Sequence, residues 1–262
     1  MVAWQIFWQS VLRLYYNIGP AFKVSLLPTV ISGAALIGLW WPFIGLKPGD
    51  ARLTAMLTNG GFPWWQMFVG VVILTFCGLW TAVSWHRYVL LDEEPGWVPP
   101  LRVDRFWAYF LRGLLVGLLL AAVGMVIVIV VSLPLTVISM AFGQSSTASA
   151  AISGPIALLV LWLALYLVGL RLAIALVGAA LGAEGGIRDT WRATKGRWGT
   201  FTALAVLLTI LQIVAGAISA LASASAPSAI IWQIAYSWVA GMVGLSILTT
   251  LYGYFVEKRA LG

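Results

Sequence analysis

Six long apolar segments dominate the chain and limit the folds that it can adopt. They cover residues 22–46, 65–90, 108–140, 155–182, 199–223 and 230–256. A helix needs about 20 mostly apolar residues to cross the hydrocarbon core of a bilayer, and each segment is long enough. Hydrophobic residues make up 62% of the 262 residues and charged residues 9%, far from the balance of soluble domains. The sequence predicts an all-α, polytopic integral membrane protein with six transmembrane helices.

The segment before the first apolar run has the pattern of a helix at the membrane surface. Its large side chains recur at i, i+4, i+7 and i+11, on one helical face: Trp4, Trp8, Val11 and Tyr15. We therefore expect an interfacial amphipathic helix over residues 1–20, followed by a six-helix transmembrane domain over 21–262. The alternative is an ordered cap on the bundle. No small-residue cleavage site precedes the first run, so we expect that run to be retained.

Basic residues are distributed unevenly over the two sides of the predicted bundle. The connections at 47–63, 141–154 and 224–229 hold only Lys47 and Arg52. The other side holds thirteen: Arg13, Lys23, Arg87, Arg102, Arg105, Arg112, Arg171, Arg188, Arg192, Lys195, Arg197, Lys258 and Arg259. Cytoplasmic connections carry an excess of lysine and arginine. We expect both termini on the cytoplasmic side of a bacterial cytoplasmic (inner) membrane.

The stretch TWRATKGRWGTF (190–201) combines two tryptophans with three basic residues just before an apolar run. On a continuous helix one face would hold Ile187, Trp191, Thr194, Trp198 and Phe201, beside a basic stripe of Arg188, Arg192 and Lys195. Such a segment can lie at the headgroup level with its cations toward anionic phospholipids. The alternative is an anchor that only sets the topology. Nucleic acid is not an expected partner, because the stretch adjoins a spanning helix and no binding module is present.

Arg171 interrupts an apolar segment, and twelve uncharged residues separate it from Glu184. These residues span about 18 Å of helix, so Arg171 can line a wet cavity within the bundle. The alternative is that the span ends near Arg171 and the remainder bends into the interface. Arg87 and Trp107 recur as Arg171 and Trp191 with a spacing of 84 residues, which hints at a parallel repeat. A headgroup or phosphate pocket between Arg87 and Arg171 is a further hypothesis.

The sequence lacks the groups that most enzymes, metal sites and cofactor sites need. It has a single cysteine, Cys77, and a single histidine, His86, and no nucleophile elbow, P-loop or zinc motif. EEPGWV (93–98) lacks the arginine that follows the paired glutamates of prenyl-protein-type proteases. We expect no enzymatic activity, no cofactor and no metal. For His86 we expect packing rather than a proton relay or haem ligand, and for Asp92, Glu93 and Glu94 a solvated charge run rather than a divalent-ion site.

Small residues recur at close-packing spacing in three of the predicted helices. They are Gly113, Gly117, Ala121 and Gly124, then Gly178 and Gly182, and finally Ala215, Ser219 and Ser223. Small faces let helix backbones approach closely in lipid. We expect most of them to pack inside the bundle, with a remaining face available to a membrane-protein partner.

Two segments carry a resemblance to a known family. EGGIRDTWRATKGRWGTFTALAVLL (184–208) resembles the amphipathic cytoplasmic connector of bacterial six-helix proteins related to the membrane domain of glycerophosphodiester phosphodiesterases. SWHRYVLLDEEP (84–95) resembles a recurring segment of uncharacterised members. The resemblance implies the fold and the membrane location. It implies no catalysis, since the soluble catalytic domain of that enzyme has no counterpart here.

Two functions follow as expectations. The first is a non-catalytic accessory or scaffolding membrane protein that contacts anionic lipid through Arg87, Arg171 and the basic aromatic segment with Arg188, Trp191, Arg192, Lys195 and Trp198. The second is a small-molecule or lipid transporter with a site near Arg171, with Pro134 and Gln212 as its only other unusual intramembrane residues.

Overall fold

The computed structural model is built of α-helices, and it describes residues 2–40, 50–58, 63–141, 146–222 and 226–261. These residues contain no strand. The helices are α1 (Val2–Tyr16), α2 (Ile18–Trp40), α3 (Ala51–Thr58), α4 (Trp64–Leu91), α5 (Val103–Ala141), α6 (Ser146–Leu181), α7 (Ile187–Ala193), α8 (Trp198–Ala222) and α9 (Ala226–Phe255). Among the described residues, six helices are long and apolar enough to cross a membrane: α2, α4, α5, α6, α8 and α9. The predicted all-α, six-span fold is confirmed, and the chain is a multi-pass membrane protein.

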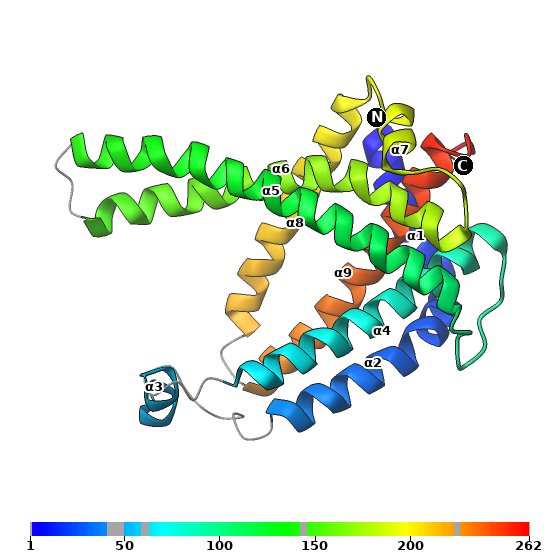
Figure 1. Cartoon of the computed structure of the whole chain (residues 1–262), viewed down its shortest axis with the longest axis horizontal. Helices are drawn as coiled ribbons and strands as arrows, with labels where there is room; N and C mark the ends of the chain where they lie inside the picture. Colours follow the sequence, from blue (N-terminus) through cyan, green and yellow to red (C-terminus); the bar gives the residue numbers. More distant parts are fainter. Residues whose placement is uncertain (1, 41–49, 59–62, 142–145, 223–225, 262) are drawn as a thin grey trace.

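The spanning helices converge at one end of the molecule and diverge toward the other (Figure 1). The converging end carries α1, α7 and both chain termini; we call it the basic end, because the basic residues of these segments lie there. From it, α5 and α6 run side by side as one long hairpin, away from the group of α2, α4 and α9. Helix α8 lies between them and contacts both α6 and α9.

The hydrophobic core is concentrated at the basic end. Its largest cluster joins four helices through Ile6 of α1, Ile174 of α6, Phe201 of α8 and Leu251 of α9, all 0% exposed. Toward the other end, side chains such as Leu118 face outward, as expected of helices whose solvent is lipid. Because lipid provides no hydrophobic drive for helix association, close packing and polar contacts must hold the helices together.

Polar side chains of α9 connect it to α4 at the basic end. The indole Nε1 of Trp85 donates a hydrogen bond to Ser246 Oγ at 3.2 Å. The next residue of α4, His86, faces Thr249, about one turn further along α9, and its ring lies 2.8 Å from the Thr249 hydroxyl. Interhelical hydrogen bonds contribute about 0.6–2 kcal/mol each within a membrane. These contacts therefore set the register of α4 against α9.

Helix α1 combines both expectations for the N-terminal segment. Its inner face is buried on the bundle through Ala3, Ile6, Ser10 and Leu14. Its outer face exposes Trp4, Trp8 and Tyr15. Arg13 attaches its end to α9, because Nη1 donates to the Thr250 hydroxyl at 3.1 Å. The segment is thus a cap on the bundle that also presents an aromatic face.

Only some of the small residues predicted to pack between helices do so. A Cβ on Gly113 would contact Leu176 at 3.6 Å, and one on Gly124 would contact Leu161 at 3.7 Å, so both lie against α6. Nothing lies within 4 Å of a Cβ on Gly117. Gly182 does not serve helix packing: it has a φ of +81° at the end of α6, where glycine adopts the left-handed conformation without strain. Ser223 lies outside the described residues.

Some predicted boundaries are wrong. The connection expected at 141–154 is helical from Ser146 onward, because its alanine-rich sequence favours helix. The 39 residues of α5 span about 58 Å, more than the hydrocarbon core. The connection expected at 47–63 contains α3; Lys47 lies outside the described residues.

Candidate functional site

Arg171 is buried between α6 and the segment that joins α6 to α8. Its side chain is 1% exposed. The guanidinium carbon lies 3.8 Å from the ring centroid of Trp191 and 4.1 Å from that of Trp198. Nε donates a hydrogen bond to Thr194 Oγ1 at 3.1 Å. The arginine is thus held between two indole rings and attaches the connecting segment to α6.

The Arg171 guanidinium has aromatic rings in place of a carboxylate. Its Nη2 donates to the carbonyl oxygens of Trp191 and Thr194 at 3.4 Å, while Nη1 is buried without a hydrogen-bond partner among the described residues. A desolvated cation over an indole face is stabilised by about 2 kcal/mol or more. The rings therefore offset part of the free-energy cost of burying the charge. This stabilisation depends on both rings staying close to the guanidinium.

The connecting segment is not the single helix that its periodicity predicted. Helix α7 ends at Ala193, α8 begins at Trp198, and Gly196 between them has a φ of +76°. Glycine permits this left-handed turn at no steric cost. Trp191, Thr194, Trp198 and Phe201 still meet, because the turn folds the two helices around Arg171. We call residues 187–198 the α7 connector.

The cations of the α7 connector point away from this buried site. Arg188, Arg192, Lys195 and Arg197 are all exposed. Trp191 and Trp198 are 36% and 48% exposed, so each ring covers Arg171 with one part and faces outward with the rest. The connector therefore presents two indole rings and four cations at the surface of the basic end.

Helix α6 continues without interruption through Arg171 to Leu181. The bend after Arg171 that the alternative expected is therefore not found. The regular backbone continues because Arg171 needs no exit to solvent: the connector returns to cover it. The surroundings of this arginine are aromatic rather than hydrated.

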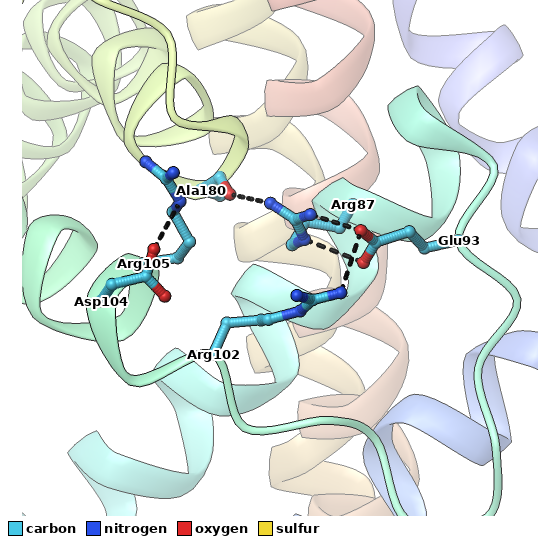
Figure 2. Close-up of polar contacts among 6 residues, drawn as sticks. All are labelled: Arg87, Glu93, Arg102, Asp104, Arg105 and Ala180. Atoms are coloured by element: carbon cyan, nitrogen blue, oxygen red, sulfur yellow. Dashed lines mark hydrogen bonds and ion pairs between the residues drawn. The ribbon is translucent and has the colours of Figure 1, made fainter.

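Arg87 belongs to a different cluster, near the end of α6 (Figure 2). Its Nε donates to Glu93 Oε2 at 2.9 Å, and its Nη2 is paired with Glu93 Oε1. Nη1 donates to the carbonyl oxygen of Ala180 at 3.0 Å. Arg102 reaches the same carboxylate at 3.4 Å. The Glu93 carboxylate thus joins α4 to Arg102, just before α5, while Arg87 itself joins α4 to α6.

The structure does not bring Arg87 and Arg171 together. The carbonyl that Arg87 binds is nine residues beyond Arg171 on α6, about 13 Å along the helix. The shared anion pocket is therefore not formed within the described residues. The 84-residue spacing also fails to produce equivalent surroundings, because Trp107 contacts Phe106 and Phe110 rather than Arg87.

We expect Glu93→Gln to remove a pH-dependent part of the stability. The Arg87 guanidinium lowers the pKa of Glu93 below its ordinary value of 4.5. A lowered carboxyl pKa stabilises the fold at neutral pH, and this contribution is lost as pH falls below 4.5 through the folded-state pKa. The pair is partly exposed, so the loss is about 1 kcal/mol. Thermal unfolding in detergent between pH 7 and pH 3 measures it.

The matched control for this prediction is Glu184→Gln, which removes an exposed carboxylate from the same end of the protein. The control is expected to keep the acid-induced loss of stability that Glu93→Gln lacks. Identical pH profiles for the two variants would contradict the role of the Glu93 pair.

Other basic residues donate to backbone carbonyl oxygens at the basic end. Arg112 Nη1 joins α5 to Ala175, within α6, at 3.1 Å and to Gly185, after α6, at 3.0 Å. Arg259 and Lys258 cap helices: Arg259 Nη2 donates to Leu90 of α4 at 3.2 Å, and Lys258 Nζ donates to Phe255 of α9 at 2.8 Å. The last carbonyls of a helix lack intrahelical partners and carry partial negative charge. Sequence reasoning assigned these cations to topology alone. Their position within a turn of helix ends was the signal for capping.

His86 is a packed residue with both ring nitrogens engaged. It is 0% exposed, 2.8 Å from the Thr249 hydroxyl at Nδ1 and 3.3 Å from the Tyr109 hydroxyl at Nε2. Thr249 donates its own proton to the Leu245 carbonyl. Nδ1 must therefore carry the proton that it donates to Thr249, and Nε2 accepts from Tyr109. The expectation of packing is confirmed.

No group of three or more histidine, cysteine, aspartate or glutamate residues that could hold a metal ion occurs in the part of the chain that the structure describes. Cys77 is buried in α4.

Comparison of the chain with protein-family models, with curated proteins and with solved structures found no match. The family resemblance of residues 84–95 and 184–208 therefore stays a prediction.

Proposed function

We propose that this chain is a non-catalytic membrane protein with an accessory or scaffolding role, which presents the α7 connector to anionic phospholipids. The observation that carries the proposal is the burial of Arg171 between Trp191 and Trp198. This contact holds the connector against α6 while its four cations remain exposed. Each cation at a membrane surface contributes about 1 kcal/mol of attraction to anionic lipid. A fixed group of four is a stronger site than the same residues on a mobile loop.

The exposed tryptophans mark the two membrane interfaces, and the basic residues gathered at the end with both termini support placing that end on the cytoplasmic side of a bacterial cytoplasmic membrane. Trp191 and Trp198 mark the basic end of the bundle, and Trp64 and Trp65 are exposed at the opposite end of α4. Tryptophans gather at both interfaces of a membrane. The 28 residues of α4 span about 42 Å, which is the thickness of a bilayer with its headgroup regions.

The same geometry favours the accessory role over a transporter centred on Arg171. A residue that lines a hydrated path needs a surface that water can reach, and Arg171 is 1% exposed. Gln212, the other intramembrane polar candidate, accepts a hydrogen bond from Tyr236 at 2.7 Å and thus joins α8 to α9. The long α5–α6 hairpin presents apolar residues such as Leu118 and Met125 outward, a face on which a membrane-protein partner can pack.

The lipid proposal is tested with the double variant Arg188→Gln, Arg192→Gln in nanodiscs of equal phosphatidylglycerol and phosphatidylcholine. Lipid that stays bound on release is counted by native mass spectrometry. Loss of two cations is expected to lower the enrichment of phosphatidylglycerol at least about tenfold. The matched control is Arg102→Gln, Arg105→Gln, two exposed cations of the same end outside the connector. Equal losses in both variants would overturn the proposal.

A further inference from the structure

A polar cavity lies at the basic end, away from the α7 connector. It has a volume of about 300 Å³ and lies between the C-terminal parts of α1 and α4 and the residues that follow α4. Its lining consists of Arg13, Asn17, Tyr88, Val89, Asp92 and Glu94. The cavity thus brings one guanidinium and two carboxylates to a common space, at the level where α1 exposes Tyr15 and Tyr16.

The positive side of the cavity is formed by Arg13. Its guanidinium makes one hydrogen bond to another described residue, from Nη1 to Thr250, so further N–H groups remain for a ligand. Burial and the neighbouring Arg259 guanidinium both lower the pKa of Arg13. Arg259 is paired with Glu257, whereas Arg13 has no carboxylate bonded to it among the described residues, so Arg13 favours an anionic group at this side of the cavity.

The negative side is formed by Asp92 and Glu94. Within the described part of the chain, neither carboxylate has a hydrogen bond or an ion pair, whereas Glu93 between them binds Arg87 and Arg102. Asp92 ends α4 in the left-handed conformation, with a φ of 54°. Of the three consecutive carboxylates, Glu93 is thus bound by arginines of the protein, whereas Asp92 and Glu94 line the cavity without a bound partner among the described residues.

The neutral lining residues are already engaged with each other. The Tyr88 hydroxyl donates to Asn17 Oδ1 at 2.6 Å, and Asn17 Nδ2 donates to the Arg13 carbonyl at 2.8 Å. These contacts fix the wall between α1 and α4, so selection among ligands falls to the three charged groups. A simple anion is repelled by the two carboxylates, and a simple cation is repelled by Arg13.

We propose that this cavity binds a zwitterion made of a primary ammonium and a phosphate, the chemistry of an ethanolamine phosphate headgroup. The phosphate accepts hydrogen bonds from Arg13, and the ammonium donates to Asp92 and Glu94. The side chain of Val89 borders the carbon atoms between the two charged groups. A quaternary ammonium has no N–H group to donate, so the site selects ethanolamine over choline. This ligand can be a bilayer lipid or a free headgroup.

The test measures lipid retained by the full chain from nanodiscs of equal phosphatidylethanolamine and phosphatidylcholine, by native mass spectrometry. The wild-type protein is expected to retain at least threefold more phosphatidylethanolamine. Glu94→Gln and Asp92→Asn are expected to reduce this preference to parity; asparagine keeps the left-handed conformation of residue 92. Glu184→Gln is the matched control and is expected to keep the preference. Arg13→Gln is not used, because Arg13 also attaches α1 to α9 and its loss would change the packing of the two helices.

A second arm identifies the source of the ligand. Free phosphoethanolamine is added to the protein in detergent without phosphatidylethanolamine, and binding is measured by calorimetry. Binding that Glu94→Gln abolishes assigns the site to a free zwitterion, whereas selective retention of the lipid alone assigns it to the bilayer. Equal retention of both lipids with no binding of phosphoethanolamine overturns the inference, as do equal effects of Glu94→Gln and Glu184→Gln. The connector variant leaves all three charged lining residues in place, so this inference and the proposed function fail separately.

Discussion

Replacing Arg171 with alanine is expected to lower the free energy of unfolding by about 3 kcal/mol, because the variant loses a desolvated cation–π contact and the charged hydrogen bonds to the α7 connector. The guanidinium carbon lies 3.8 Å from the ring centroid of Trp191 and 4.1 Å from that of Trp198. Its loss leaves these rings over an empty space at the end of α6. Thermal unfolding in detergent measures the stability, and tryptophan emission reports the changed surroundings of Trp191 and Trp198.

Two further variants separate the contribution of this contact from that of charge. Arg197→Ala removes an exposed cation from the same connector and is expected to change stability by less than about 0.5 kcal/mol. Arg171→Lys keeps the charge but loses the planar group that stacks on indole, so an intermediate loss is expected. If Arg171→Ala unfolds at the same temperature as Arg197→Ala, the connector is not held by Arg171.

The second large effect is expected at His86, where alanine is expected to cost about 3 kcal/mol. The change leaves a cavity among α4, α5 and α9 and removes the acceptor of the Tyr109 hydroxyl. Both hydrogen-bond partners of the ring are buried, so water cannot replace the lost contacts cheaply. Thermal unfolding in detergent at pH 7 measures the difference.

A double-mutant cycle tests whether His86 acts through Tyr109. Tyr109→Phe alone is expected to cost about 1 kcal/mol, since it leaves Nε2 without a donor. In the His86→Ala background the same change is expected to cost nothing, because the hydroxyl has no partner left to lose. Additive costs would show that the two side chains do not interact.

The positions of the spanning helices were predictable because their signal is local. A bilayer requires runs of about 20 apolar residues, and this requirement acts on each segment of sequence without reference to the others. The same holds for the aromatic periodicity of α1, in which Trp4 and Trp8 share the exposed face. Helix boundaries were less predictable where composition changes gradually, as in the alanine-rich start of α6 at Ser146.

The candidate sites were predictable only as a set of residues. Arg171, Trp191 and Trp198 were all identified, but their mutual contact depends on the turn at Gly196, which breaks the predicted helix. A pocket shared by Arg87 and Arg171 was one hypothesis, and Arg87 instead binds Glu93. An arginine can pair with a carboxylate, a carbonyl or an aromatic ring, and its residue type does not distinguish among these partners.

The cavity around Arg13 could not be predicted from the sequence at all. Asp92 and Glu94 follow α4 by one and three residues, whereas Arg13 precedes them by about eighty positions in α1. No periodicity links these segments. Their meeting depends on the packing of α1 across the ends of α8 and α9.

The sequence by itself determined the class of protein, the six spans and the collection of cations at one end, because hydropathy and charge act on each segment through its contact with lipid or water. The tertiary structure alone decided which cations cap helices, as Arg259 does, and which remain at the surface. It also decided that Arg171 is enclosed by tryptophan rings. These outcomes depend on distances of a few ångströms between helices that are remote in the chain, and hydrogen bonds and cation–π contacts exist only at those distances.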